Sequence, residues 1–354
     1  MDVAKRLADN GGSHSKIPKV EASIERADMI LAGYKTFGYI PILSLGLLGN
    51  IVIIVYFIKI NKKHFRKMST YHFLIIILAI IDLVVILCGS ILSIPLDENN
   101  DKNLNIDRYY YDDVLNIIKE GSTTASCWIL VLLSYERYRS ITHPFNRRLK
   151  KKYAMYLGIY LCVVCIMVHV PTPFLIHHSK DERLTNLGFA KTDFVIAKNG
   201  KMIPIIITSV CLDCVLPSMA LAFLYWKIYK HLTENVLVIQ PIVSSTENKA
   251  TSPPSLSVNC RRRNTHTSAT KTIRNLVILY VCLVWPSRIL YIALFLIAQY
   301  NIMFYQDNYL LLKVLGETSH LLEILNNVVN VFVYGIMING FRSFLWRLIC
   351  CDRK

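Results

Sequence analysis

Seven predominantly apolar stretches occur along the chain, and each approaches the ~20 residues that a helix needs to cross a lipid bilayer. They lie near residues 34–58, 70–94, 114–138, 154–176, 202–226, 273–299 and 309–338. Charged residues make up only 18% of the sequence, well below the share of about a quarter found in soluble domains. The sequence therefore predicts an all-α protein, a single bundle of seven transmembrane helices.

The distribution of Lys and Arg predicts how this bundle is oriented. Two short connections, 59–67 and 139–152, hold 11 Lys or Arg in 23 residues, whereas 95–108, 177–201 and 300–308 hold 7 in 48. Cytoplasmic loops keep the excess of basic residues. We therefore expect a multi-pass plasma-membrane protein with its amino terminus outside and its carboxyl terminus in the cytoplasm.

The net charge of +16 would suggest a nucleic-acid partner in a soluble protein. Here the basic residues cluster beside apolar runs, so membrane lipid headgroups are the expected counter-charge, and no nucleic acid is expected. None of the ten cysteines falls in an expected outer loop, so the sequence offers no outer-surface disulfide.

Three regions are expected from the composition. Residues 1–33 form an extracellular segment, 34–338 form the bundle, and 339–354 form a short amphipathic helix and cytoplasmic tail. Within the bundle, residues of about 232–270 are rich in Ser, Thr, Pro and Asn, which predicts a disordered third inner loop. Cys350 and Cys351 follow the amphipathic segment and are candidate palmitoylation sites.

Polar residues inside membrane spans are costly, so each is a functional hypothesis. In chain order they form these motifs: Gly49-Asn50, Leu78-Ala79-Ile80-Ile81-Asp82, Glu136-Arg137-Tyr138, Pro217 with Tyr225, Pro286, and Asn330-Val331-Phe332-Val333-Tyr334 followed by Phe341. Together, at these depths, they resemble the rhodopsin-like (class A) G-protein-coupled receptors over residues 34–351. Tyr135 to Tyr138, His143-Pro144-Phe145 and Asn327 to Asn330 further resemble the invertebrate FMRFamide-like neuropeptide receptors.

The resemblance implies a receptor, not an enzyme, that binds an extracellular ligand and activates a heterotrimeric G protein by moving the inner ends of its helices. It implies that the coupling and activation switch comprises Glu136, Arg137, Tyr138, Tyr225, Asn330 and Tyr334. A local charge pair with Glu136 is expected to hold Arg137 at rest. Arrestin and a kinase are expected to act through the Ser/Thr-rich stretch 242–272, because only three residues follow Cys351 and none carries a hydroxyl.

No cofactor is required, but the resemblance implies a possible allosteric sodium ion. Asp82 needs a cation or a proton at mid-bilayer depth, and Ser126, Asn326 and Asn330, with Asn50, are placed to converge on it. Carboxylate, hydroxyl and amide oxygens suit a hard cation. A water-filled polar network without an ion is the alternative.

Charged and polar residues in the outer halves of the spans define the expected ligand pocket: Lys119, Glu120, Asp213, Arg288, Glu317, His320 and Glu323. Both signs of charge suit a zwitterionic or peptide ligand, especially one with an arginine or an amidated end. Lys119 stands where amine receptors carry aspartate, and Ile324 where opsins carry the retinal lysine, so both of those ligand classes are disfavoured. One alternative is that Lys119, Glu120, Arg288 and Glu323 neutralise one another as buried pairs. Another is a chemosensory receptor for a small molecule.

Several positions depart from the family pattern. Asp112 stands where a cysteine bridges to the second outer loop, Val331 replaces a proline, and Trp285 directly precedes Pro286 instead of lying two residues before it. Trp285 should then point about 100° away from the usual direction. A membrane transporter is a weaker reading, because the span number is odd and no repeat is visible. An intramembrane enzyme lacks a Ser-His or metal-ligand constellation.

Overall fold

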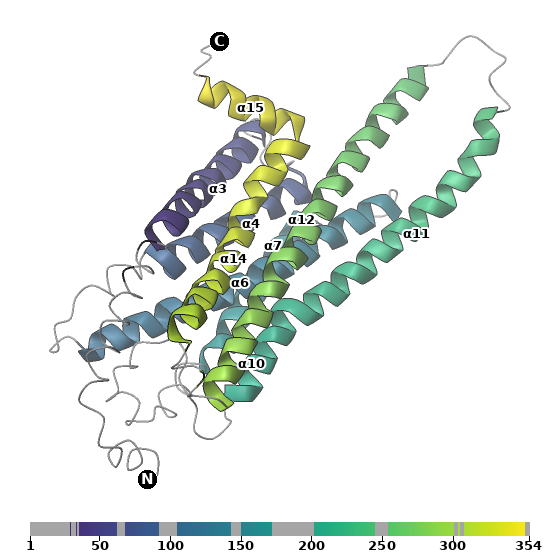
Figure 1. Ribbon diagram of the computed structural model, residues 1–354. Coiled ribbons are helices and arrows are strands. Elements are labelled where there is room, and N and C mark those ends of the chain that lie inside the picture. Colours follow the sequence, from purple (N-terminus) through teal and green to yellow (C-terminus); the bar gives the residue numbers. More distant parts are fainter. Residues whose placement is uncertain are drawn as a thin grey trace, which may run out of the picture.

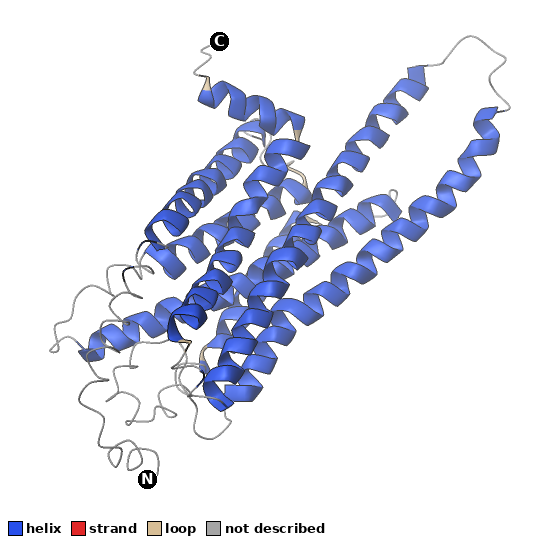
Figure 2. Cartoon of the chain, viewed as in Figure 1, coloured by secondary structure: helices blue, strands red, loops and turns tan. Residues whose placement is uncertain are grey.

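The computed structural model describes residues 35–61, 68–91, 105–142, 150–171, 202–244, 254–300 and 308–350, together with positions 29, 33 and 304. Within these ranges some side chains are not described, among them those of residues 105–110, Asp112, 232–244 and 254–270. Throughout the described residues the regular elements are helices, without a strand (Figure 2).

The helices follow one another along the chain and lie side by side as one bundle (Figure 1). Three π-helical turns adjoin longer helices: η2 (Lys35–Tyr39), η4 (Leu87–Ile91) and η6 (Cys211–Val215). The longer helices are α3 (Ile40–Asn61), α4 (Thr70–Ile86), α6 (Asn105–Thr142), α7 (Lys151–His169), α10 (Met202–Val210), α11 (Leu216–Ser244), α12 (Pro254–Tyr300), α14 (Tyr309–Met337) and α15 (Asn339–Ile349). The segment α10–η6–α11 is the fifth span. This is the seven-transmembrane fold predicted from the sequence.

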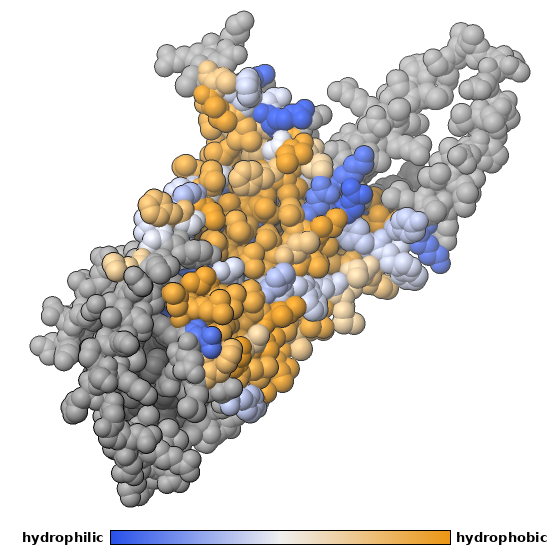
Figure 3. Space-filling view, viewed as in Figure 1, coloured by the Kyte–Doolittle hydropathy of each residue, from blue (hydrophilic) through white to orange (hydrophobic). Residues whose placement is uncertain are grey.

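Apolar side chains cover the outside of the bundle. Figure 3 shows them as a broad band across the visible face, and Leu48, Ile159 and Phe332 are each at least half exposed. A soluble monomer rarely exposes so much contiguous apolar surface. Lipid chains are the matching environment.

Among the described residues, six helical segments are long and apolar enough to cross a membrane, judged by length and composition alone. The remaining member of the bundle, α6, is more polar. It packs against α4, α7, α11 and α12, and its polar run Ser122, Thr123, Thr124 and Ser126 is buried. Because its neighbours shield α6 from lipid, this helix can carry polar side chains that a lipid-facing helix could not.

Glycines bring some of these helices unusually close together. A Cβ atom on Gly121 of α6 would lie 2.6 Å from the Cα of Ile166 on α7. A Cβ on Gly46 of α3 would lie 2.6 Å from the side chain of Val328 on α14. Small residues at such crossings allow the close backbone approach that packs membrane helices.

The stretch between the fifth and sixth spans differs from the predicted disordered loop. Helix α11 continues through residues 232–244, and α12 begins at Pro254 and covers 254–270, so both extend past the bundle (Figure 1). Extending an existing helix adds one hydrogen bond for each residue fixed, and proline is well tolerated in the first helical turn. Residues 245–253 lie outside the described part.

After Ile338, which is extended (φ −106°, ψ 99°), the chain turns away from α14 into α15 (Figure 1). Phe341 is fully buried, with its ring centroid 5.0 Å from that of Tyr56 on α3. Trp346, Leu348 and Ile349 are exposed. The structure therefore contains the predicted amphipathic helix. We call its end of the bundle the α15 end.

Candidate functional site

A group of ionisable side chains lies largely buried near the end of the bundle opposite α15, and we call it the charged cluster: Lys119, Glu120, Asp213, Arg288, His320 and Glu323. Arg288 on α12 lies at its centre. Its Nη2 atom is 2.8 Å from Oε1 of Glu323, 3.0 Å from Oδ2 of Asp213 and 3.3 Å from Oε2 of Glu120. One guanidinium thus joins four spans through α6, η6, α12 and α14.

Lys119 supplies the second cation of the charged cluster. Its Nζ lies 2.9 Å from Oε1 of Glu120 and 3.9 Å from Oε2 of Glu323. The aliphatic part of this side chain passes over Gly89 in η4, where a Cβ atom would lie 2.9 Å from the Cγ and Cδ of Lys119. The absence of a side chain at position 89 therefore gives Lys119 its path to the carboxylates.

Asp213 is completely buried and is one of the three carboxylates that contact Arg288. Its carboxylate accepts hydrogen bonds from Thr124 and from Ser209, the latter at 3.0 Å. Thr124 also contacts Nε2 of the buried His169 at 3.0 Å, and Tyr280 donates to the backbone carbonyl of Asp213. Burial of Asp213 is thus compensated by several donors and a cation.

The charged cluster carries three carboxylates against two permanent cations, so its formal charge is negative unless His320 is protonated. Its more open members are Glu120 and His320, whose side chains are 27% and 28% exposed. The Nδ1 atom of His320 lies 3.7 Å from Oε2 of Glu323. A positively charged ligand group would complete the charge balance.

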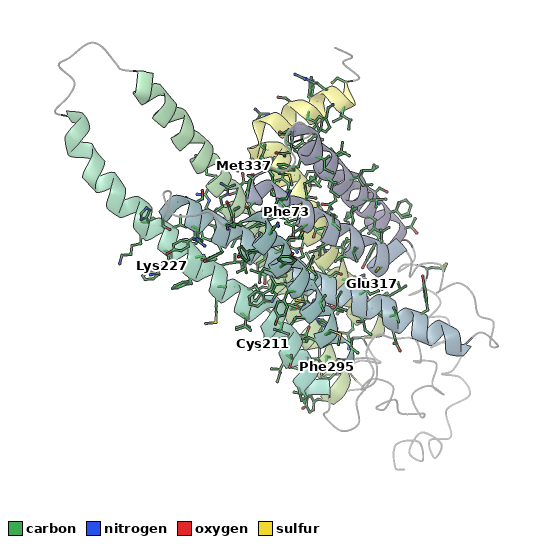
Figure 4. All side chains as sticks on the ribbon, turned by 180° about the vertical axis from the view of Figure 1, so that it is seen from behind. Phe73, Cys211, Lys227, Phe295, Glu317 and Met337 are labelled. Carbon is green, nitrogen blue, oxygen red and sulfur yellow. The ribbon has the colours of Figure 1, made fainter. Side chains whose placement is uncertain are left out.

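Glu317 lies one turn before His320 on α14, at the same end of the bundle and far from Met337 (Figure 4). Tyr39 of η2 donates hydrogen bonds to its Oε2 at 3.0 Å and to its backbone carbonyl at 2.8 Å. The ring centroid of Tyr39 is also 5.8 Å from that of His320. Glu317 therefore lies beside the charged cluster and links it to the first span.

A second polar site lies nearer the middle of the bundle, around the fully buried Asp82 of α4. Ser126 donates to its Oδ1 at 3.0 Å, and Asn330 donates to its Oδ2 at 2.6 Å. Each carboxylate oxygen thus has one donor, from α6 and from α14. Hydrogen bonds to the charged form offset part of its burial cost.

A small cavity adjoins this carboxylate, with polar lining residues Ser126, Asn326, Asn330 and Tyr280 and apolar or weakly polar ones Leu78, Cys127, Leu130 and Leu276. Oxygen atoms of a hydroxyl and of amides are suitable ligands for sodium and for water alike. Asn50, expected in the same group, instead donates to the carbonyls of Gly46 and Asn327 at 3.0 and 3.2 Å. It therefore ties α3 to α14, and the hydrogen bonds described for it do not include Asp82.

The third polar site is at the α15 end, where Arg137 is 9% exposed. Its Nε lies 3.5 Å from Oε2 of Glu136, but neither atom has a hydrogen-bond partner. The guanidinium carbon lies 3.5 Å from the ring centroid of Tyr71 on α4. The side chain of Arg137 is therefore stacked on an aromatic face, and its carboxylate neighbour is poorly aligned.

The model of the family described as 7 transmembrane receptor (rhodopsin family) matches residues 49–334. The chain belongs to the rhodopsin family of seven-transmembrane receptors. The crystal structure of squid rhodopsin is similar with a TM-score of 0.67 and 16% sequence identity, covering 91% of this chain and 88% of that one. At that identity the likeness shows the fold alone. No curated protein sequence matches the receptor.

The receptor brings together most of the residues singled out from its sequence. Six of the seven ligand-pocket candidates form the charged cluster. Four of them, Lys119, Glu120, Arg288 and Glu323, are paired with one another, which is the arrangement that the sequence left as an alternative. Ser126 and Asn330 contact Asp82, and Asn326 lines the adjoining cavity.

Among the switch candidates, Tyr334 is buried and its hydroxyl has no hydrogen-bond partner. Tyr225 is partly buried against the core. Tyr138 is partly buried, with its ring 6.4 Å from that of Tyr135. Among the described contacts, neither Tyr225 nor Tyr334 forms a direct bond with Arg137.

Two departures from the family pattern have structural counterparts in the receptor. Val331, in place of proline, packs its side chain against Gly49, where a Cβ would lie 2.9 Å from Cγ1 of the valine. Trp285 points towards α11 and donates from Nε1 to Oγ of Ser218 at 2.9 Å, while Val284 occupies the core. The first follows from the residue type at position 331 of α14. The second follows from the position of Trp285 directly before Pro286 on α12.

Sequence reasoning missed several contributors to these sites. Tyr71, Thr124 and His169 looked like ordinary span residues, and their partners come from other helices. Gly89 gave no signal, because its role depends on the side chain that crosses it. For His169, a histidine within an apolar span was a signal that could have been followed.

Proposed function

We propose that this protein is a G-protein-coupled receptor whose α15 end faces the cytoplasm and whose charged cluster lies towards the outside. The observation that carries the proposal is the placement of three polar sites along α6. Glu120 belongs to the charged cluster, Ser126 to the Asp82 site, and Arg137 to the α15 end. Glu120 and Arg137 are separated by 17 positions, or about 25 Å at 1.5 Å per residue.

Ligand binding at one end can reach the other because Tyr280 connects the charged cluster with the Asp82 site, and α6 carries residues of all three sites. Tyr280 donates to the carbonyl of Asp213 in the charged cluster and lines the cavity beside Asn330. Asn330 in turn donates to Asp82. A ligand that prefers one arrangement of this connected set shifts the population towards it, and a movement of α6 would carry Arg137 with it.

The expected ligand presents a cation, such as an arginine or an amino group, to the open carboxylate Glu120 and to His320 beside Glu323. The excess of one carboxylate in the charged cluster supports a cationic group. The resemblance to FMRFamide-like receptors supports an amidated neuropeptide. A chemosensory receptor for a small cationic molecule is the second candidate, because the same charge balance would serve it.

Other partners follow from the family assignment as proposals. Arrestin and a kinase would act through hydroxyls between residues 242 and 272. Sodium would use the carboxylate of Asp82 and the oxygens of Ser126, Asn326 and Asn330. Cys350, which is exposed at the end of α15, would carry a palmitoyl chain; Cys351 lies outside the described residues.

The ligand is tested by screening an amidated-peptide library on cells that express the receptor, with a second-messenger readout. Peptides with an arginine near the amidated end should activate, and their citrulline analogues should be at least tenfold weaker, because citrulline keeps the shape but loses the charge. Activation by cationic small molecules alone would favour the chemosensory reading. Equal potency of arginine and citrulline peptides would reject a charge-recognising pocket.

A further inference from the structure

At the α15 end, Arg137 lies against an aromatic ring as well as beside the carboxylate of Glu136. Its guanidinium carbon lies 3.5 Å from the ring centroid of Tyr71, and the two residues are only 9% and 6% exposed. A cation over the face of tyrosine within about 6 Å is attracted by the ring quadrupole, and the attraction is larger where water is excluded. This contact therefore contributes to the position of Arg137.

The neighbouring carboxylate is close to Arg137 but does not form a hydrogen bond with it. Glu136 is adjacent in sequence, and residues i and i+1 on a helix do not face each other. The nearest atoms are 3.5 Å apart, and both lack a hydrogen bond. The expected charge pair between Glu136 and Arg137 is therefore present, but without a hydrogen bond between the two side chains.

No other described side chain at the α15 end takes the place of Glu136 as a carboxylate partner of Arg137. Among the side chains described at the α15 end, Glu136 is the single carboxylate, and α12 presents Lys271 and Arg274 there. Groups of like sign repel Arg137 and cannot anchor it. Among the described contacts of Arg137, the ring of Tyr71 is therefore the one that attaches it to another helix.

Tyr71 is itself well positioned to act on Arg137. It lies in the first turn of α4, whose start is capped by Ser69, since Oγ of Ser69 accepts the backbone N–H of His72 at 3.2 Å. Its ring packs in the core, and its hydroxyl has no hydrogen-bond partner. The capped start of α4 and the surrounding core therefore hold the ring in place. The hydroxyl makes no hydrogen bond that would explain the contact between Tyr71 and Arg137.

We propose that the aromatic face of Tyr71 is a latch that holds Arg137 against α4 in the resting receptor, and that signalling requires its release. The proposal rests on the proposed function, because the released arginine is the group offered to the G protein. In this receptor a cation–π contact between α4 and α6 performs the restraint. Tyr71 is a positioning residue: it acts through Arg137.

The test compares Tyr71→Leu, which removes the aromatic face, with Tyr71→Phe, which keeps the face and removes the hydroxyl. We expect agonist-free nucleotide exchange on a purified G protein to rise about three- to tenfold in Tyr71→Leu, and to stay at the wild-type level in Tyr71→Phe. A damaged fold would lower exchange, so a rise separates release from disruption. Tyr71→Met provides a second non-aromatic variant if the leucine variant does not fold.

Backbone hydrogen exchange of residues 133–142 is measured in parallel on receptor without G protein. It should speed up in Tyr71→Leu or Tyr71→Met and stay unchanged in Tyr71→Phe. Equal effects of the leucine and phenylalanine variants, or none in either non-aromatic variant, would overturn the latch. If no form of the receptor stimulates nucleotide exchange, the proposed function fails, while the hydrogen-exchange comparison still decides the latch.

Discussion

Arg288 and Glu323 form a buried ion pair between α12 and α14, with Nη2 of the arginine 2.8 Å from Oε1 of the glutamate. The same nitrogen lies within 3.3 Å of Glu120 and 3.0 Å of Asp213. Removing one partner of a buried pair leaves the others unpaired, which costs more than the pair itself contributes. The charged cluster should therefore be a determinant of folding as well as of ligand binding.

Replacing Arg288 by Met should destabilise the purified receptor strongly, by about 3–5 kcal/mol in the free energy of unfolding, as for other broken buried pairs. Three carboxylates would then face Lys119 alone. Arg274→Met is the matched control, since Arg274 is exposed on the same helix, and it should change the unfolding midpoint little. Equal midpoints for the two variants would mean that the cluster does not stabilise the fold.

The packing of Gly49 against Val331 predicts a non-additive pair of mutations. Gly49→Ala should destabilise by about 1–3 kcal/mol, as overpacking does, because the new methyl would overlap the valine side chain. In a Val331→Ala background the same change should cost much less. Gly158→Ala is the control, since its Cβ would lie 3.5 Å from Ile77, an ordinary contact. Additive unfolding free energies in the double-mutant cycle would reject the contact.

The fold was predictable because seven apolar stretches and the cost of unpaired backbone groups in lipid leave few alternatives. The charged cluster was predictable in membership, since buried charges such as Arg288 and Glu323 must find partners. Its geometry was not, because Gly89 and the π-helical turn that presents Asp213 act only once helices are packed.

Tyr71 gave no signal in the sequence: its partner Arg137 is 66 positions away, and Glu136 looked like the obvious counter-charge. The helical parts of 232–270 were missed because composition does not report how far a stable span extends.

Sodium should stabilise the receptor through Asp82 if the adjoining cavity holds the ion. We expect the thermal unfolding midpoint to rise when sodium chloride replaces choline chloride at constant ionic strength, and agonist affinity to fall. Asp82→Asn keeps the shape but removes the charge, so it should abolish both responses. A flat wild-type response would favour water in the cavity, and a mutant that still responds would place the ion elsewhere.

Phosphorylation between residues 244 and 270 should terminate signalling, since each phosphate adds about −1.5 to −2 charges to this basic region. Replacing its serines and threonines by Ala should prolong the second-messenger response and reduce arrestin recruitment at least several-fold. Thr272 is kept, because it is fully buried. Wild-type recruitment by the alanine variant would show that the regulatory phosphates are attached elsewhere.

The central claim, that this receptor activates a heterotrimeric G protein through Arg137, is tested most directly by guanine-nucleotide exchange with purified receptor in lipid nanodiscs. The wild type should accelerate exchange on at least one class of G protein above the receptor-free rate. Arg137→Ala should return exchange to that rate while surface expression and the unfolding midpoint stay close to wild type. Exchange by Arg137→Ala equal to that of the wild type, or no acceleration by the wild type on any class of G protein, would contradict the account.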